Sequence, residues 1–386
     1  MIVGIMDIMP IGHYTLVESI AQIYLSDTQN EICIFINKDA ENNFASLKKE
    51  NSIRLKIITK KTEQTSIEFL KQINTYALSC LYVVTLEKGF KSFLIPKFTF
   101  KIYLVVHNVD LWFNSTMNFK LYTFLNQLNF SNIIFKIKNN LIYPYYRHRI
   151  IKKVLSSKGK FVVLNKTIQN ELNKYIESNN SFVIPFSIYN PKLINKSITN
   201  KKIRICIPGI VESLRRNYNS ILDIFEENID FFKTKFEVDF LGPHTNSDDS
   251  KAIIKRVKKL NDLGFDMLFY NTNYIPTDTY DENLSKANII LGNMNVVLNK
   301  YSSYGKTKET GIIFTMIRAA KPGILPIEYD LLDELKSSTI QFLDYADLKL
   351  KLIELAKNPA LLNQLSENAL NNSKLFSASN IYNSII

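Results

Sequence analysis

Short apolar segments alternate along this chain with amphipathic helical segments, and the alternation predicts an α/β fold. Apolar runs bounded by polar or turn residues are typical of buried strands in parallel sheets. In the first half such runs occur at 2–6, 31–36, 53–58, 81–85, 102–106 and 160–164, and in the second half at 204–207, 236–241, 287–291 and 323–325. We therefore expect βαβ units throughout, with parallel sheets covered by helices.

The pattern is interrupted once, near residues 185–200, where Pro185, Pro191 and a run of Asn, Lys, Ser and Thr separate two apolar runs. A chain of 386 residues is long enough for two domains. We predict an N-terminal domain at 1–190, a C-terminal domain at 191–372 and a final helix at 373–386. Residues 346–386 have a helical pattern throughout.

Composition and charge limit the function classes. With 46% hydrophobic and 22% charged residues the chain is globular, not disordered. It has no apolar stretch of membrane-spanning length, no signal-peptide pattern at its start, and three cysteines in or beside apolar runs. We expect a cytoplasmic protein with reduced thiols. The net charge of +12 favours an anionic partner, which is nucleic acid, a membrane surface or a phosphorylated molecule.

Several familiar signatures are missing. No G-x-G-x-x-G follows a strand, and no P-loop motif occurs. The histidines have no metal-ligand spacing with one another or with cysteine. We predict neither a bound cofactor nor a metal.

The start of the second half carries a candidate phosphate site. The run at 204–207 leads through Gly209 to Arg215 and Arg216, just before a helical segment. In a parallel sheet, the loop after a strand lies at the edge where ligands bind. Guanidinium groups pair with phosphate oxygens in a bidentate fork, so a nucleotide diphosphate fits. The alternative is a solvated arginine pair at a helix start.

A second candidate anion site lies downstream, where the polar loop 301–311 runs into an apolar helix at 312–320. The backbone amides of Thr310, Gly311 and Ile312 would point away from the helix start toward a ligand. Gly311 would let that ligand approach the backbone closely. The alternative is a capped helix start with no ligand.

The order of these features resembles the GT-B glycosyltransferases, especially glycosyltransferase family 4. Shared features are the strand, Gly loop and basic residue through Arg216, a loop and helix ending in Gly-Lys-Pro (here Ala320-Lys321-Pro322), and C-terminal helices like 358–370. The resemblance covers roughly 202–386, and the first half agrees only in its general βα layout. It implies two Rossmann-like domains with sheets facing across a cleft and a last helix that crosses back to the first domain.

The resemblance also implies a function. A metal-independent, hexosyltransferase-like enzyme would move a sugar from a UDP- or GDP-linked donor to a glycan or lipid-linked acceptor in bacterial-type polysaccharide or glycoconjugate synthesis. The implied donor-binding residues are Gly209, Arg215, Arg216, Tyr304, Lys306, Thr310, Gly311 and Ile312.

The chain departs from the family at the two glutamates eight positions apart in this loop and helix, which are here Thr307 and Thr315. Only Glu309 supplies a carboxylate nearby, and we assign it to the nucleotide ribose or the sugar. The departure leaves retention or inversion of the anomeric centre open. It also permits one alternative, a catalytically silent binding or scaffold protein. A second alternative, a sugar-nucleotide isomerase on the same fold, would need carboxylate groups around the sugar, and their scarcity in this loop speaks against it.

Two loops of the first half are candidates for the acceptor side. Gly12 and His13 follow the first strand and are the acceptor-side candidates. His107 and Asn108 follow another strand, in a loop that resembles the histidine-containing loop of family 4, and with Glu309 they are the candidate catalytic residues. His107 is expected to orient the donor sugar or to deprotonate the acceptor, since a base works best with a pKa near the working pH. A purely structural histidine is the alternative.

An aromatic and basic stretch covers residues 119–153 and overlaps a segment from 111 to 146 that we expect to be mainly helical. Aromatic residues at helical spacing with solvated lysines are usually a helix core, which is the favoured interpretation. Peripheral contact with the inner face of the cell membrane would suit a lipid-linked acceptor. Stacking on nucleic acid ranks below both, and we expect no nucleic-acid partner.

Overall fold

The chain folds into two compact units in the computed structural model, which describes residues 1–9, 13–51, 53–114, 142–194, 202–245, 247–272 and 274–385. Unit 1 comprises Met1–Phe186, Lys306–Glu309 and Ala378–Ile386. Unit 2 comprises Ser187–Gly305 and Thr310–Ser377. Gly12 and most of the aromatic and basic stretch lie outside the described residues.

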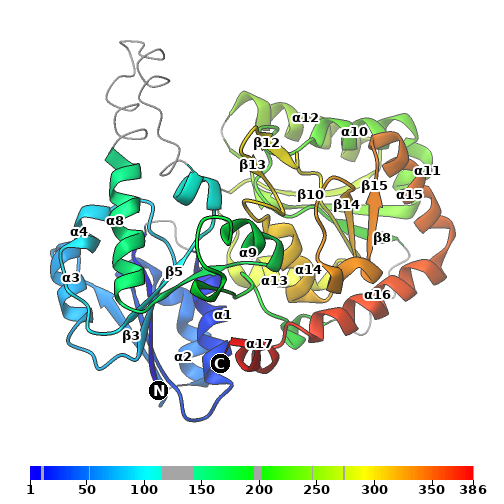
Figure 1. Cartoon of the computed structure of the whole chain (residues 1–386). Coiled ribbons are helices and arrows are strands. Elements are labelled where there is room, and N and C mark those ends of the chain that lie inside the picture. Colours follow the sequence, from blue (N-terminus) through cyan, green and yellow to red (C-terminus); the bar gives the residue numbers. More distant parts are fainter. Residues whose placement is uncertain are drawn as a thin grey trace, which may run out of the picture. The chain divides into compact units, whose positions relative to one another are not determined.

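Within its described residues, unit 1 contains a seven-stranded sheet in the order β3-β2-β1-β4-β5-β6-β7, and all neighbouring strands are parallel (Figure 1). The strands are β1 (Ile2–Asp7), β2 (Glu31–Asn37), β3 (Leu55–Lys60), β4 (Cys80–Val83), β5 (Lys101–Val105), β6 (Lys160–Val163) and β7 (Ser181–Val183). The inner strands are almost entirely buried, as expected for a sheet that is covered on both faces.

Helices cover both faces of this sheet. On one face α1, joined by the C-terminal α17, packs against β1 and β2, and on the other α8 packs against β5 and β6. The helical segments of unit 1 are α1 (Tyr14–Leu25), η1 (Lys38–Phe44), α2 (Ala45–Glu50), α3 (Ser66–Ile73), α4 (Phe90–Leu94), η2 (Asp110–Asn114), α8 (Tyr143–Ser156), α9 (Lys166–Leu172), η5 (Ser178–Asn180) and α17 (Ala378–Ile385). Thr65 and Glu68 form a capping box at the start of α3, which fixes where that helix begins.

Unit 2 repeats this plan with six parallel strands among its described residues, in the order β10-β9-β8-β11-β14-β15. An antiparallel pair, β12 with β13, lies outside the main sheet. The strands are β8 (Ile203–Cys206), β9 (Phe236–Pro243), β10 (Asp266–Tyr270), β11 (Ile289–Leu291), β12 (Val297–Asn299), β13 (Ser302–Ser303), β14 (Gly323–Pro326) and β15 (Thr339–Phe342).

The main core of unit 2 joins the sheet to α10, α12 and α15 through buried side chains such as Phe225, Val257 and Leu352. The helical segments are η6 (Pro191–Leu193), α10 (Tyr218–Glu227), α11 (Ile229–Lys235), α12 (Asp248–Asp262), α13 (Thr277–Lys286), α14 (Gly311–Ala319), η7 (Asp333–Ser338), α15 (Tyr345–Lys357) and α16 (Pro359–Lys374). The helical pattern expected for 346–386 is thus three helices, α15, α16 and α17.

Both sheets change winding direction next to their first strand. In unit 1 the chain runs outward from β1 to β3 and then returns to the other side of β1 with β4, and in unit 2 β8 and β11 are related in the same way. Ligands of doubly wound sheets bind at the carboxyl ends of the two strands at this point. In this chain those positions are the ends of β1 and β4 and the ends of β8 and β11.

Candidate functional site

In unit 1, polar side chains meet where β1 and β4 end. The Asp7 carboxylate accepts hydrogen bonds from the backbone N–H of His13 at 2.7 Å and of Met9 at 3.4 Å, and the Thr85 hydroxyl lies 3.5 Å away. Asp7 is only 1% exposed. Burial raises its pKa to about 6, although the two backbone donors act in the opposite direction. The carboxylate therefore holds the start of α1 in place.

The two candidate histidines of unit 1 stack on each other. The ring centroids of His13 and His107 are 4.2 Å apart, and the ring planes are inclined by 22°. His13 Nδ1 lies 2.8 Å from the Thr85 hydroxyl, and His107 Nε2 lies 2.8 Å from the carbonyl oxygen of Val84. The structure thus brings together two residues that are far apart in the sequence, and both loops are anchored on the end of β4.

The geometry defines the chemistry of His107. Because a carbonyl oxygen only accepts hydrogen bonds, Nε2 carries the proton and Nδ1 carries the lone pair. Burial, helped by the neighbouring His13, lowers the pKa of His107 to about 3. Burial lowers the pKa of His13 as well. Both rings are neutral near pH 7, so His107 suits hydrogen bonding better than proton abstraction.

The segment Lys306–Glu309 belongs to unit 1 and pairs with the loop after β5. The Val109 N–H donates to the Thr307 carbonyl at 2.9 Å, and Asn108 forms an antiparallel bridge with Lys308. The side-chain amide of Asn165 donates to the Glu309 carboxylate. Asn165 also caps α9 by accepting from the Ile168 N–H at 2.7 Å. The Glu309 carboxylate is therefore held by a residue that sits two positions after β6.

In unit 2, the Arg216 side chain lies against the glycine loop after β8. A Cβ atom placed on Gly209 would lie 2.2 Å from Arg216 Nη2, so no larger residue fits under this guanidinium. Gly209 also has φ of +106°, which L side chains rarely adopt. Arg216 Nη1 is buried and has no hydrogen-bond partner among the described residues. Arg215, in contrast, is exposed, and its carbonyl oxygen accepts from the Asn295 N–H at 2.9 Å.

Asn293, two residues after β11, is a feature that sequence reasoning missed. The residue is 0% exposed, yet neither its Oδ1 nor its Nδ2 has a hydrogen-bond partner among the described residues. Its carbonyl oxygen accepts from the Asn217 N–H at 2.9 Å, and the next residue, Met294, forms an antiparallel bridge with Arg216. A buried amide without partners costs free energy, so a polar ligand at this point would satisfy it.

The start of α14 reaches the same segment of unit 2. The Ile312 side chain packs at Gly292, because a Cβ on that glycine would lie 3.3 Å from Ile312 Cδ1. Thr310 caps the helix by accepting from the Ile312 N–H at 3.4 Å, and Gly311 faces open space. Arg216 and the start of α14 thus both contact residues 292–294 at the carboxyl edge of the sheet. Of the three residues expected to donate their amides, Gly311 is exposed, whereas Thr310 and Ile312 are buried.

The two remaining predicted donor-binding residues, Tyr304 and Lys306, differ in burial and belong to different units. Tyr304 is buried in unit 2, and its N–H donates to the Val296 carbonyl at 2.9 Å, whereas Lys306 is exposed and belongs to unit 1. Thr307 and Thr315, at the family's glutamate positions, are both buried. The Thr315 hydroxyl donates to the Gly311 carbonyl at 2.9 Å and lies 3.3 Å from the Tyr280 hydroxyl. The Thr315 hydroxyl thus bonds within α14 and beside α13, where the resemblance would place a carboxylate.

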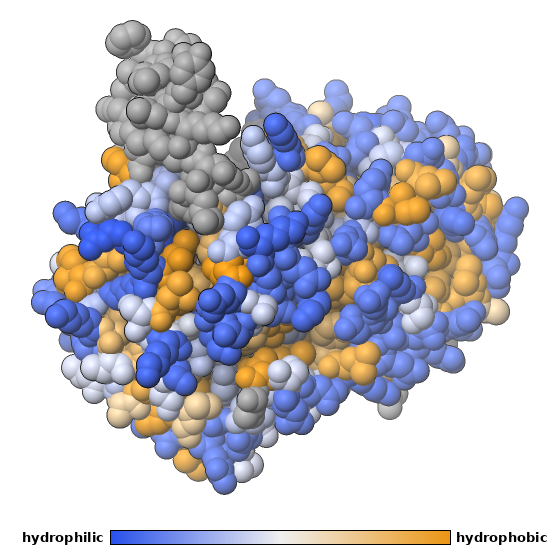
Figure 2. All heavy atoms as spheres, in the orientation of Figure 1, coloured by the Kyte–Doolittle hydropathy of each residue, from blue (hydrophilic) through white to orange (hydrophobic). Residues whose placement is uncertain are grey.

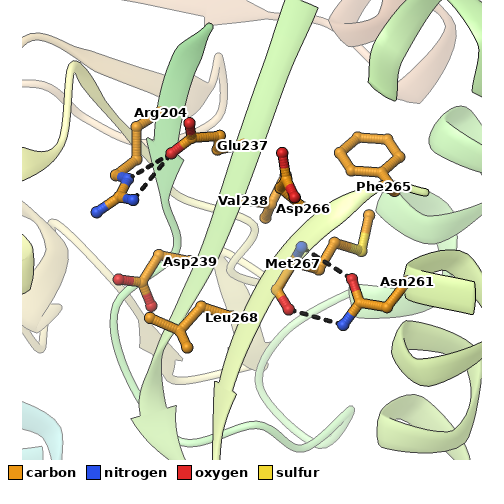
Figure 3. A pocket seen from close by; sticks show the side chains of 9 residues that line it. All are labelled: Arg204, Glu237, Val238, Asp239, Asn261, Phe265, Asp266, Met267 and Leu268. Carbon is orange, nitrogen blue, oxygen red and sulfur yellow. Dashed lines mark hydrogen bonds and ion pairs between the residues drawn. The ribbon is translucent and has the colours of Figure 1, made fainter. Parts of the chain in front are cut away.

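A hollow of about 380 Å³ opens in another part of unit 2 (Figure 3). It lies at the amino-terminal halves of β8, β9 and β10, where Arg204 pairs with Glu237 at 2.9 Å. Doubly wound sheets bind ligands at the opposite strand ends, so we do not assign the function to it. Within the described residues, no group of three or more His, Cys, Asp or Glu side chains could hold a metal ion.

The described end of the aromatic and basic stretch forms α8. Arg147 is buried, with its guanidinium carbon 5.6 Å from the ring centre of Phe90 and 5.9 Å from that of Trp112, whereas Tyr145 is exposed. On the face drawn in Figure 2, hydrophilic residues separate the apolar ones into patches. No helix among the described residues is both long and apolar enough to span a bilayer. For α8 the structure agrees with a helix that buries one side.

Comparisons with known proteins identify the fold. No protein-family model and no curated protein sequence matches the chain. Among solved structures, Anabaena HepE in complex with UDP is 11% identical with a TM-score of 0.61, over 100% of this chain and 98% of that one. Sucrose-phosphate synthase from Thermosynechococcus elongatus is 13% identical with a TM-score of 0.58, over 100% and 97%. The fold is GT-B. The predicted fold class and the resemblance to GT-B glycosyltransferases are thereby confirmed.

A third GT-B structure matches over a shorter part of its own length. Staphylococcus aureus TarM, in complex with α-GlcNAc-glycerol and UDP, is 16% identical with a TM-score of 0.52, over 82% of this chain and 57% of that one. Identities this low establish the GT-B architecture alone.

The residues that sequence reasoning missed lie at or just after the carboxyl ends of strands in the two sheets. Asp7 ends β1, and Thr85, Asn165 and Asn293 each stand two residues after β4, β6 and β11. His107 has the same position after β5. A polar residue directly after an apolar run was therefore the signal available in the sequence.

Proposed function

We propose that the chain is a metal-independent GT-B glycosyltransferase that moves a hexosyl group from a UDP- or GDP-linked sugar to a glycan or lipid-linked acceptor, in polysaccharide or glycoconjugate synthesis. The observation that carries the proposal is the Arg216 guanidinium. It lies on Gly209 with a buried, unpartnered Nη1, at the strand edge that the start of α14 also reaches. HepE, solved with UDP and with UDP-glucose, supports this choice of donor.

Unit 2 would bind the donor. In the reaction the bond between the sugar C1 and the β-phosphate oxygen breaks, a bond between C1 and the acceptor oxygen forms, and the nucleoside diphosphate leaves with one more negative charge. Arg216 and the Gly311 amide would stabilise that charge in a partly desolvated setting. Asn293 Nδ2 would donate to the same group, which explains its missing partner.

Unit 1 would bind the acceptor. The neutral His107 would offer Nδ1 as a hydrogen-bond acceptor to a sugar hydroxyl, with the Val84 carbonyl and the stacked His13 ring holding the imidazole in place. A group with a pKa of about 3 is a weak base at neutral pH, so the acceptor proton would leave with the departing diphosphate. Asn108 and Glu309 would then position the loops, since both are bonded within unit 1.

Titration with UDP, GDP and ADP tests the donor site directly. We expect UDP or GDP to raise the melting temperature of the wild type, and Arg216→Ala to weaken binding by at least tenfold, since a charged hydrogen bond contributes roughly 1.5–3 kcal/mol. Arg215→Ala is the matched control and should change affinity less than threefold, because its side chain is exposed. Wild type that binds no nucleotide, or equal losses in both variants, would refute the proposed donor site.

A second candidate function is a silent nucleotide-sugar-binding protein. Thr307 and Thr315 favour it, because the family places glutamates at these positions. The release of UDP from UDP-glucose and the release of GDP from GDP-mannose, with and without a mixture of acceptor glycans, distinguish the two. Acceptor-dependent release supports a transferase, whereas nucleotide binding without release supports the silent protein.

A further inference from the structure

A second hollow lies in unit 1 and has no part in the proposed donor chemistry. Its volume is about 160 Å³, and it lies where β1 and β4 end, against α3 and α4. Its deep wall is apolar and consists of Met6, Leu70, Leu86 and Phe93, each of them buried. Well-packed protein interiors rarely leave apolar space of this size, so the hollow is a candidate binding site.

The cavity has a polar wall residue, Thr85, which connects it to the histidine cluster. Thr85 lines the cavity, and its hydroxyl lies 2.8 Å from His13 Nδ1 and 3.5 Å from the Asp7 carboxylate. Lys88 and Gly89 also line it and are exposed, so the cavity is open to solvent there. A molecule inside would therefore have an apolar part against Leu70 and a polar part beside Thr85.

The size and lining define the occupant. Apolar cavities of about 150 Å³ take benzene and gain little from water, because water finds no hydrogen-bond partners in them. We propose that this cavity binds an apolar group of about six carbon atoms on the acceptor, and so positions the acceptor hydroxyl beside Thr85 and the His13–His107 pair. That this group belongs to an acceptor rests on the proposed function, whereas the binding of such a group to the cavity does not. An aromatic ring and the first carbons of an alkyl chain have the chemistry required.

Binding can be measured without any donor. We would label the methionine methyl groups with ¹³C and titrate the protein with benzyl alcohol, 1-hexanol and glycerol, because Met6 and Met9 both line the cavity. Saturable shifts of these two signals with either alcohol, and none with glycerol, are expected. Shifts with benzyl alcohol alone identify a ring, and shifts with hexanol alone identify an alkyl chain. No shift with either, or equal shifts with glycerol, overturns the proposal.

Filling the cavity provides the second readout. Ser92→Phe on α4 and Ser66→Phe on α3 each add a ring at the cavity wall, and either should weaken alcohol binding at least tenfold. Two variants from different helices guard against one that fails to fold. Ser156→Phe, at the exposed end of α8, is the matched control and should bind as the wild type does. Unchanged binding in a folded Ser92→Phe or Ser66→Phe protein overturns the proposal.

Turnover separates this inference from the proposed function. With UDP-glucose as donor we would compare phenyl, octyl and methyl β-glucosides as acceptors in wild type and Ser92→Phe. A KM at least tenfold lower for phenyl or octyl than for methyl glucoside, lost in Ser92→Phe, supports the inference. Equal KM values in wild type overturn it. No turnover of any acceptor, with alcohol binding intact, counts against the transferase and leaves the cavity as a binding site.

Discussion

At the scale of single residues, hydrogen bonding separates two buried asparagines with opposite roles. Asn30 is 2% exposed and its Nδ2 donates to the Tyr24 carbonyl at 3.0 Å and to the Tyr382 hydroxyl at 2.8 Å, whereas Asn293 has neither side-chain atom partnered among the described residues. Removing satisfied bonds costs stability, and removing an unsatisfied buried amide does not. We predict that Asn293→Ala leaves the free energy of unfolding unchanged or raises it by about 1 kcal/mol.

The same substitution should weaken UDP binding about tenfold, as measured by calorimetry. Asn30→Ala is the control of equal size, and it should lower the free energy of unfolding by roughly 1–3 kcal/mol without changing UDP affinity. A destabilised Asn293→Ala protein with normal affinity would show that Asn293 is structural.

The protonation of His107 gives a second prediction at this scale. Because burial lowers its pKa to about 3, the imidazole should stay neutral between pH 5 and 9. We therefore expect its NMR signals, assigned with a His107→Ala sample, to remain constant over that range with the proton on Nε2. Enzymatic activity should show no acid limb from this residue. A titration midpoint near the ordinary value of 6.5 would restore the general-base role.

The residue scale also shows how much of the site the sequence could provide. Gly209, Arg216 and the start of α14 were predictable because strand, loop and helix patterns place them at one sheet edge. Asn293 was not, since its importance lies in bonds that it does not make, which only the folded surroundings define. The difference between Arg215 and Arg216 was equally hidden, because adjacent side chains at a helix start differ only once the loop is folded.

At the scale of elements, α14 ends in an unfavourable conformation. Its C-cap residue, Ala320, has φ of 50° and ψ of 49°, in the left-handed region that glycine adopts most readily. An L residue with a Cβ costs roughly 1 kcal/mol there. We predict that Ala320→Gly raises the free energy of unfolding by about 0.5–1 kcal/mol. Ala319→Gly, inside the helix, should lower it by about 1 kcal/mol in the same urea titration. If both variants change the free energy of unfolding in the same direction, Ala320 is not strained.

Strand β9 carries a buried acid that makes stability depend on pH. Asp239 is 2% exposed, its Oδ1 has no partner among the described residues, and burial raises its pKa to about 6. A raised pKa means that the folded state favours the protonated form of Asp239. The stability of the folded protein therefore has its full value below about pH 4, as far as Asp239 determines it, and falls as the pH rises through 6. Asp239→Asn does not titrate. Its stability relative to wild type should therefore grow by up to roughly 3 kcal/mol between pH 4 and 7.

Urea unfolding at pH 4, 5.5 and 7 measures this difference. Leu268→Ala, at an exposed position of the neighbouring strand, is the control and should show a constant difference because it changes no titratable group. If the difference between Asp239→Asn and wild type is also the same at all three pH values, burial does not raise the pKa of Asp239.

The elements themselves were largely predictable, and the exceptions have a common cause. Each apolar run that was predicted as a strand overlaps a strand, and all of these strands except β3 are inner strands of their sheets, where both faces are covered. The main-sheet strands that the pattern did not predict, β7, β10 and β15, are all edge strands. β10 alternates exposed and buried residues, and β15 is mostly half-exposed, so neither has a continuous apolar run. The pair of β12 and β13 was missed because these strands have only three and two residues, too few to show an alternating pattern.

At the scale of the whole molecule, unit 1 is assembled from three separate parts of the chain, and its last part is the C-terminal helix α17. Tyr382 anchors this helix. Its hydroxyl donates to the Asp27 carboxylate at 2.6 Å and accepts from Asn30 at 2.8 Å, and its ring meets Tyr24 edge-on at 5.6 Å. Because all three partners lie in or just after α1, the end of the chain stabilises the helix that begins with the His13 loop.

We predict that deleting residues 378–386 destabilises unit 1 selectively. The amides of α1 and β2 should exchange with solvent at least tenfold faster, and the methyl signals of Met6 and Met9 should broaden, while unit 2 retains its protection and its UDP affinity. Tyr382→Phe should have a smaller effect and lower the free energy of unfolding by roughly 1–2 kcal/mol, since it removes only the hydroxyl. Tyr274→Phe, an exposed tyrosine of unit 2, is the control for the substitution itself. Equal loss of protection in both units after the deletion would show that they unfold as one, and the C-terminal helix would then stabilise the molecule as a whole instead of the acceptor side alone.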